Sequence, residues 1–206
     1  MIDILYYINL DRRTDRLQNL EENVLPSINL EGMKKHRIPA IDHTGYSHVS
    51  QRTAGCSLSH IRCWKDAIKE VYNKIMVVED DFELVKNEEE VNQILEELKC
   101  TEFGVCNLGY ANWAPLRKIE GSIFYRCNNI QTTSCYVASV PFLKTMLPHI
   151  EDATEKLMRC EDRHINAIDM AWKKFQKTDD WMVSERIGKQ KASYSDIERG
   201  FNDYGV

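Results

Sequence analysis

The sequence predicts an α/β protein whose central sheet is mostly parallel, and two observations predict it. Short apolar runs of strand length alternate with segments whose apolar residues recur at helical spacing, the pattern of repeated β-α units. The chain also has 206 residues, 43% of them hydrophobic and 29% charged, with no internal repeat and no linker-like stretch. These values are typical of a soluble globular protein, and we expect residues 1–206 to form one domain.

The first half of the chain alternates strands and helices. Residues 4–10 form an apolar run that predicts a buried strand, and apolar side chains at helical spacing follow over residues 17–25. Residues 36–42 are expected to form a short second strand. Over residues 57–71 the apolar positions mark one face of a helix, and residues 75–78 predict the next strand.

The second half contains further helices, strands and a polar tail. Asn87 and Glu90 form a capping-box pattern ahead of one helix, and Pro141 suits the first turn of another. A third helix is expected over residues 161–175, and a polar tail covers 191–206. The remaining expected strands lie at residues 103–108, 123–125, 136–139 and 181–183.

The composition argues against several classes of protein. A formal net charge of −5 disfavours a nucleic-acid binder, which needs a basic face. The seven cysteines are an odd number without a CxxC pair, so we expect free thiols in a reducing compartment. The N-terminal stretch has neither the basic start of a signal peptide nor the roughly 20 apolar residues of a membrane span. We therefore expect a cytoplasmic protein, and the sequence indicates no oligomeric state.

Three consecutive acids, Glu79, Asp80 and Asp81, follow the strand at residues 75–78. Ligands of open α/β sheets bind at the carboxyl ends of the strands, where these acids lie. Alternation along an extended segment turns Glu79 and Asp81 to one side, and two carboxylates suit Mg²⁺ or Mn²⁺. The alternative is a strand end whose charges are solvated.

A basic loop follows the first strand. Arg12, Arg13 and Arg16 lie within about one helical turn of one another, and guanidinium groups donate hydrogen bonds in pairs to phosphate oxygens. The alternative is a solvated helix start in which Asp15 pairs with an arginine. Together with an acidic strand end in the same sheet, this loop predicts a site for a metal-bound diphosphate nucleotide.

Four blocks resemble a known family. The stretches "YYINLDRRTDR", "AGCSLSHIRCWKDAI", "VVEDDFEL" and "SYSDIE" are similar, in this order, to blocks of glycosyltransferase family 25, the group of lipooligosaccharide-biosynthesis proteins and collagen galactosyltransferases. The resemblance implies a GT-A, Rossmann-like fold, a UDP-sugar donor carrying galactose or glucose, Mn²⁺ or Mg²⁺, and inversion at the anomeric carbon. The acceptor would be a hydroxyl of a glycan or of a hydroxylated protein side chain.

The same resemblance assigns roles to residues. It makes Asp81 the first metal ligand, with Glu79 and Asp80 beside it. A carboxylate near the ribose accepts hydrogen bonds from its hydroxyls, although Asp42 is equally compatible with an exposed turn. The residues implied for the nucleoside and diphosphate are Asn9, Leu10, Arg13, Arg16, Ala40 and Asp42.

Four other residues, in two blocks of the sequence, are expected near the donor. Ser57, Ser59 and His60 are placed at a helix N-terminus, where free N–H groups favour an anion; the alternative for His60 is a capping or packing role. Asp196, in the block "SYSDIE", would complete the metal or diphosphate site if the tail folds over it. The alternative there is a disordered tail.

Inversion needs a base that takes the proton of the acceptor hydroxyl. Asp162, at an expected helix start, and Asp169, in its middle, are the two candidates. Asp162 is the favoured one, and each is also compatible with an ordinary helix aspartate. Two other functions are compatible with part of these observations. One is an inactive relative that serves as a binding module, although the acidic triplet is retained. The other is a nucleotidyltransferase, which would need a glycine-rich loop in place of "DRRTDR".

Overall fold

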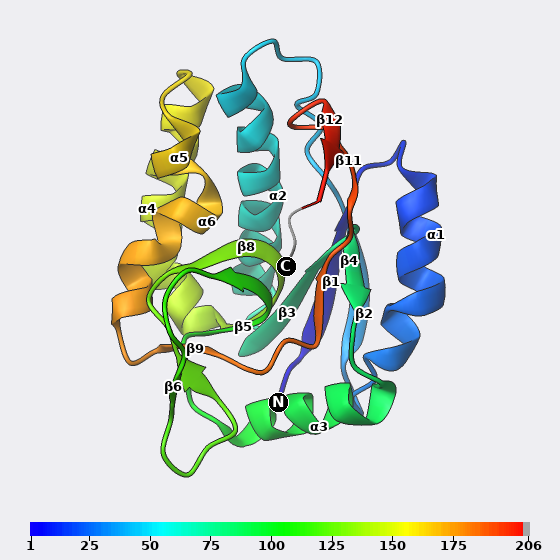
Figure 1. The fold of residues 1–206 in the computed structure, drawn as a ribbon, viewed down its shortest axis with the longest axis vertical. Coiled ribbons are helices and arrows are strands. Elements are labelled where there is room, and N and C mark those ends of the chain that lie inside the picture. Colours follow the sequence, from blue (N-terminus) through cyan, green and yellow to red (C-terminus); the bar gives the residue numbers. More distant parts are fainter. Residues whose placement is uncertain (204–206) are drawn as a thin grey trace.

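The computed structural model describes residues 1–203 and has three layers, with helices on both faces of an eight-stranded sheet (Figure 1). The strand order is β2-β1-β3-β8-β5-β9-β7-β6. The sheet strands are β1 (Ile4–Asn9), β2 (Lys34–Pro39), β3 (Lys74–Glu79), β5 (Val105–Asn112), β6 (Arg117–Lys118), β7 (Tyr125–Arg126), β8 (Ile130–Ser139) and β9 (Trp181–Val183).

Alternating side chains of the sheet divide the core in two. On one face, Leu5 and Met76 pack with helices α1 and α3, whereas on the other Tyr6 and Val77 pack with α2 and α4. Burial on both faces explains why these strands read as continuous apolar runs in the sequence. The helices are α1 (Thr14–Asn23), α2 (Val49–Lys69), α3 (Glu88–Cys100), α4 (Val140–Met158), α5 (Arg163–Asn166) and α6 (Ile168–Ala171), with 3-10 helices η1 (Leu25–Ser27) and η2 (Trp172–Lys177).

The expected α/β class is confirmed, but the sheet is mixed and not mostly parallel. Strand β1 runs parallel to β2 and β3, as the alternation of strands and helices predicted. Strand β8, however, lies antiparallel between β3 and β5. The chain reaches β8 from β5 through the short strands β6 and β7 and without a crossover helix, and a parallel neighbour requires such a crossover.

Two helix predictions need correction. The helix expected over 57–71 begins at Val49, because His48 caps it with its ring nitrogen on the Ser50 N–H. The helix expected over 161–175 is divided into α5, α6 and η2: Ala167, with ψ of 146°, separates α5 from α6, and α6 continues directly into the 3-10 helix η2. The capping box of Asn87 and Glu90 is confirmed.

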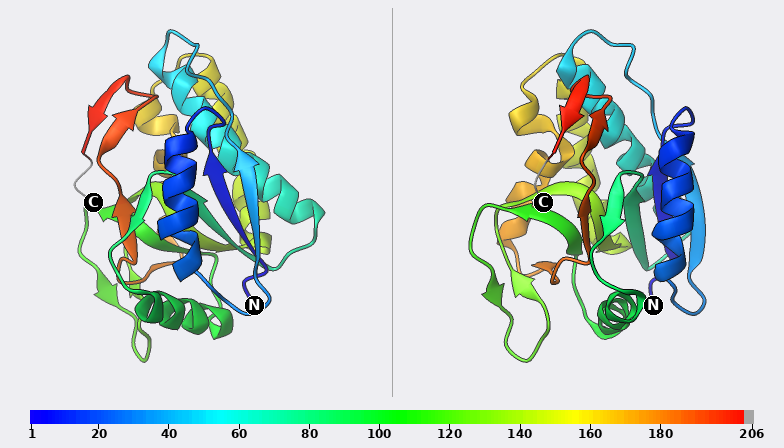
Figure 2. Two further views of the ribbon diagram at one scale, coloured as in Figure 1. Left: turned by 90° about the vertical axis from the view of Figure 1, so that its right-hand side faces the viewer. Right: turned by 45° about the vertical axis from the view of Figure 1, so that its right-hand side comes forward.

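The C-terminal segment forms two short strand pairs outside the eight-stranded sheet. Strand β10 (Gly188–Gln190) pairs with β4 (Phe82–Leu84), and β11 (Ser193–Ser195) forms an antiparallel hairpin with β12 (Gly200–Asn202). The expected polar tail is therefore ordered as far as the description extends, and its residues 204–206 lie outside it. Figures 1 and 2 place the hairpin between α1 and α2, at the end of the sheet where β1 and β3 end.

Candidate functional site

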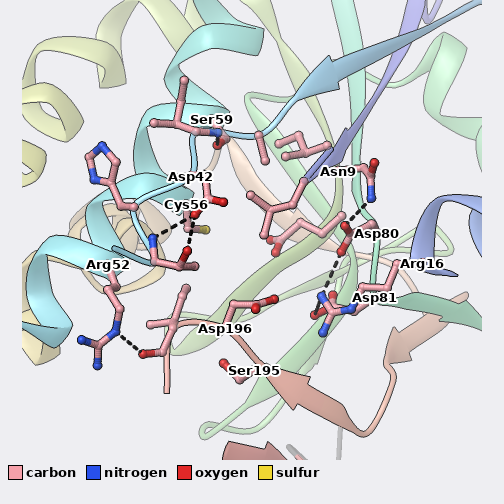
Figure 3. Close-up of a pocket in the computed structure, with 18 of the residues that line it drawn as sticks. Asn9, Arg16, Asp42, Arg52, Cys56, Ser59, Asp80, Asp81, Ser195 and Asp196 are labelled. Atoms are coloured by element: carbon pink, nitrogen blue, oxygen red, sulfur yellow. Dashed lines mark hydrogen bonds and ion pairs between the residues drawn. The ribbon is translucent and has the colours of Figure 1, made fainter. Parts of the chain in front are cut away.

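A cavity of about 140 Å³ lies where the parallel strands β1, β2 and β3 have their carboxyl ends. Helix α2 forms one of its walls, and the segment from Gln190 to Ile197 closes it from the opposite direction. The residues predicted for the site that line it are Asn9, Leu10, Arg16, Ala40, Asp42, Ser59, His60, Glu79, Asp80, Asp81 and Asp196. Figure 3 labels Asn9, Arg16, Asp42, Ser59, Asp80, Asp81 and Asp196 among them.

The acid–arginine side of the cavity consists of Arg16, Asp80 and Asp81. The Arg16 Nη1 atom is 2.9 Å from Asp80 Oδ1 and 3.3 Å from Asp81 Oδ2. Asn9 donates to Asp80 Oδ2 at 2.7 Å, and Gln190 donates to Asp81 Oδ2 at 3.0 Å. Figure 3 shows both aspartates turned toward Arg16.

This arrangement differs from the expected pairing of Glu79 with Asp81. The strand ends at Glu79, and Asp80 and Asp81 form a turn, so the alternation of side chains stops there. A single guanidinium group joins Asp80 to Asp81, whereas Glu79 makes its hydrogen bonds with His60 and Thr133.

The carboxylates of Asp80 and Asp81 are buried away from water, and this raises their pKa values. Burial, and then the negative charge of Glu79, raise the pKa of Asp81 to about 7. Burial also raises the pKa of Asp80, although Arg16 opposes the shift. Among residues 1–203, no group donates a hydrogen bond to the buried Oδ1 atom of Asp81. A buried carboxylate oxygen without a donor fits a cation ligand.

The histidine side of the cavity consists of Cys56, His60 and Glu79, and Thr133 binds Glu79 from outside the cavity wall. His60 Nε2 lies 3.3 Å from Glu79 Oε1, and the Thr133 hydroxyl donates to the same oxygen at 2.5 Å. Burial raises the pKa of Glu79, but the hydrogen bond and charge of His60 outweigh it, so that this pKa is lowered overall. The other ring nitrogen of His60 is 3.0 Å from the Tyr136 hydroxyl.

The C-terminal hairpin brings an acid to the basic loop. Asp196 accepts from Arg12 at 2.8 Å and from Arg13 at 3.0 Å. Arg16 also donates to the carbonyl of Tyr194 at 2.8 Å. The expected alternative, in which Asp15 pairs with an arginine of the loop, is present as well, since Arg13 binds both Asp15 and Asp196.

The two base candidates lie in different surroundings. Neither of them lines the cavity. Asp162 is exposed and caps α5 through the His164 N–H at 2.8 Å. Asp169 accepts from the backbone N–H of Thr132 at 3.3 Å, and burial raises its pKa. Thr132 has a φ of 71°, a conformation that β-branched residues rarely adopt and that accumulates at functional sites.

The sequence model of glycosyltransferase family 25, described as an LPS biosynthesis protein, matches residues 2–168. The chain belongs to glycosyltransferase family 25. The resemblance of its four sequence blocks is therefore confirmed.

Solved structures agree with the fold of this family 25 protein. A glycosyltransferase involved in the glycosylation of the major capsid of PBCV-1 superimposes with a TM-score of 0.57, at 11% identity over 97% of both chains. The glycosyltransferase GlyE from Streptococcus pneumoniae TIGR4 gives 0.53 at 8% identity, covering 90% of this chain and 45% of that one. These identities show the fold alone, and they confirm the expected GT-A-type architecture. No curated protein matches the sequence.

One expectation about this family 25 protein is wrong. Ser57, Ser59 and His60 lie in the middle of α2 and not at its N-terminus, so they offer no free helix N–H groups to an anion. Ser59 donates to the carbonyl of Gly55 and accepts from the Ile41 N–H at 2.8 Å, and Ser57 is fully buried outside the cavity. A Cβ on Gly55 would lie 2.6 Å from the Ile41 carbonyl, so glycine permits this close approach of α2.

The family 25 site also contains residues that sequence reasoning did not single out. Arg52 is buried and donates to the carbonyls of Ser47 and Ile197, which fastens the hairpin segment to α2. Cys56, Thr133 and Gln190 also reach the site. The block "AGCSLSH" contains Cys56, but nothing in the sequence marked the other three. Within residues 1–203, no helix is long and apolar enough to cross a membrane.

Proposed function

We propose that this protein is a metal-dependent, inverting glycosyltransferase that moves galactose or glucose from a UDP-sugar to a hydroxyl of a glycan or of a hydroxylated protein side chain. The single observation that carries the proposal is the buried Asp81 oxygen without a donor, in a carboxylate that lies near Glu79 and pairs with Arg16 through its other oxygen. Family membership supports sugar transfer in general. The donor, the acceptor and the stereochemistry are proposals.

Asp81 and Glu79 would hold Mn²⁺ or Mg²⁺. The hydrogen bonds of Glu79 within residues 1–203 end on Oε1, which leaves Oε2 for a hard cation. When bound, the cation would neutralise charge on the departing diphosphate. Asp80 acts differently, because Asn9 and Arg16 occupy both of its oxygens, and its role is to hold Arg16 in place.

Arg12, Arg13 and Arg16 would bind the diphosphate, because their guanidinium groups already hold oxygen acceptors. Those acceptors belong to the hairpin. A site for a ligand of this size typically has roughly 300–1,000 Å³, and the cavity has about 140 Å³. The donor therefore displaces the contacts of Asp196 as it enters.

The nucleoside would lie against Leu10, Ala40 and Asp42. Asp42 Oδ1 accepts from the backbone and hydroxyl of Thr44, and Oδ2 pairs with the half-exposed Arg12 at 3.1 Å. Once a diphosphate draws Arg12 away, Oδ2 is free to accept from a ribose hydroxyl.

Asp169 is the base that we favour over Asp162. Burial raises the pKa of this carboxylate, which makes it a stronger acceptor for the proton of an acceptor hydroxyl. Asp162 is instead engaged in capping α5.

We also propose a location in a reducing compartment such as the cytoplasm. All seven cysteines are free thiols, and this supports such a location.

Calorimetric titration of UDP and of ADP, each with and without Mn²⁺, tests this function. We expect UDP to bind only with Mn²⁺, and Asp81→Ala to weaken that binding about a hundredfold or abolish it, because a metal ligand is lost. Glu83→Ala is the matched control, because Glu83 lies two residues further along and pairs with Lys189 outside the cavity wall. Failure of the wild-type protein to bind UDP with Mn²⁺ would refute the proposal and favour an inactive relative.

A further inference from the structure

A thiol, an imidazole and a carboxylate converge on the histidine side of the cavity. One ligand atom each from Cys56, His60 and Glu79 lies within 4.8 Å of the others. We propose that these three residues form a binding site for a thiophilic divalent cation, with zinc as the ion of choice, next to the hard-cation site at Asp81 and sharing Glu79 with it. Zinc sites with three protein ligands of these types leave a fourth position open.

The helix and strand bring the three ligands together. Cys56 and His60 are four residues apart on α2, so their side chains lie one above the other on one helix face. Glu79 is the last residue of β3, and its carboxylate faces that helix. The geometry therefore depends on two regular elements and not on a loop.

A second layer of contacts already orients the ligands. The Tyr136 hydroxyl is 3.0 Å from His60 Nδ1 and accepts from the indole N–H of Trp64 at 2.8 Å. The hydroxyl of Thr133 fixes the Glu79 carboxylate from the other direction at 2.5 Å. A histidine that ligates a metal through one nitrogen commonly hydrogen-bonds through the other, and Tyr136 provides that partner.

Ligand type separates this site from the one at Asp81. Thiolate and imidazole favour Zn²⁺, whereas Mn²⁺ and Mg²⁺ favour oxygen ligands such as those of Asp81. At a given nitrogen or sulfur site, Zn²⁺ also binds more tightly than Mn²⁺. The two sides of the cavity thus select different cations, with Glu79 between them.

The binding step balances as an exchange of two protons for a metal. The sulfur–metal bond forms as the thiol of Cys56 releases its proton to solvent. The Nε2 atom of His60, which faces Glu79 in the metal-free protein, also releases its proton to solvent as it ligates the metal, while Nδ1–H keeps its hydrogen bond to Tyr136. No oxidant or reductant is needed. A consequence that rests on the proposed function is that zinc, by taking Glu79, weakens UDP binding in the presence of Mn²⁺.

Cobalt spectroscopy tests the site without any assay of sugar transfer. Titrated with Co²⁺, the wild-type protein is expected to develop the near-ultraviolet charge-transfer band of a cobalt–thiolate bond, and Zn²⁺ should displace it. Cys56→Ser should remove the band and weaken Co²⁺ binding roughly tenfold or more. The exposed cysteines Cys100 and Cys160 supply the matched controls, since Cys100→Ser and Cys160→Ser should leave the band unchanged.

A second measurement uses the wild-type protein alone, in case a variant fails to fold. Alkylation mapped by mass spectrometry should show that Cd²⁺ protects Cys56 and does not protect Cys100 or Cys160. A band that persists in Cys56→Ser, or Cys56 alkylation that Cd²⁺ does not slow, would overturn the inference. Neither outcome depends on UDP binding, so this site and the proposed function fail separately.

Discussion

The two sides of the cavity are constructed in opposite ways. On the acid–arginine side, charged groups from the first loop, the end of β3 and the C-terminal hairpin neutralise one another, and the Arg16, Asp80 and Asp81 side chains retain 14%, 10% and 12% of their exposure. On the histidine side, Tyr136 and Trp64, both fully buried, fix the ring of His60. Ion pairs of the first kind are exchangeable for a charged ligand, whereas a buried hydrogen-bond network holds its geometry before any ligand arrives.

The strongest test of the histidine side is Asp169→Asn, because Asp169 accepts from Thr132, the chain neighbour of the Thr133 that binds Glu79. We expect the rate of UDP release from UDP-galactose and UDP-glucose to fall by about 10²–10⁴ while UDP affinity is kept, since the change removes a base and not a donor contact. In the wild type the rate should decrease toward low pH, because a carboxylate with a raised pKa takes up its proton sooner. Asp162→Asn is the competing arm, and a greater loss there would transfer the role to Asp162.

Stability supplies a readout for the same variant that is independent of activity. The pKa of Asp169 is raised by folding from about 3.9, so above that pH the folded protein keeps a proton that the unfolded chain releases. The free energy of unfolding therefore decreases as pH rises through this window in the wild type. Asp169→Asn should lack this contribution and be at least as stable as the wild type at pH 7 in urea denaturation.

On the acid–arginine side, Arg16→Ala should lower the free energy of unfolding by about 3 kcal/mol, because it leaves Asp80 and Asp81 without the guanidinium group that they share. Urea denaturation in the presence of EDTA measures the effect, and Arg62→Ala, at an exposed arginine of α2, is the control. Equal effects of the two changes would contradict the view that Arg16 supports the ionised pair.

The smallest effect is expected at the hairpin. Asp196→Ala releases Arg12 and Arg13, and UDP affinity with Mn²⁺ should rise about three- to tenfold, in keeping with the modest energy of partly exposed ion pairs. Glu198→Ala removes another acid of the hairpin, which pairs with Arg163, and should not change the affinity. Weaker binding of UDP to Asp196→Ala would show instead that Asp196 completes the donor site.

Local patterns predicted the first half of the fold well. Strands β1 and β3 are apolar runs buried on both faces, and the capping box at Asn87 sets the start of α3. The first two turns of α2 were missed because "VSQRTAG" shows no apolar periodicity, and their helical state depends on packing and on the cap by His48. The antiparallel direction of β8 follows from how the chain returns through β6 and β7, which no local pattern encodes.

The candidate site divides in the same manner. The acids at the end of β3 were predictable because parallel strands carry their carboxyl ends to one edge of a sheet. Cys56, Arg52 and Gln190 join them only after helix α2 and the C-terminal segment have packed. The spacing of these three residues in the sequence does not indicate that they lie at one site in the fold.

The position of the β11–β12 hairpin has a consequence for the order in which the protein folds. Core residues of both faces are complete by Ile187, whereas the hairpin begins at Ser193. During folding, therefore, the body of the protein can form with an uncovered cavity, and the hairpin can pack over it afterwards. Protease cleavage between Gln190 and Ser193 would return the protein to that uncovered form with both hydrophobic cores intact.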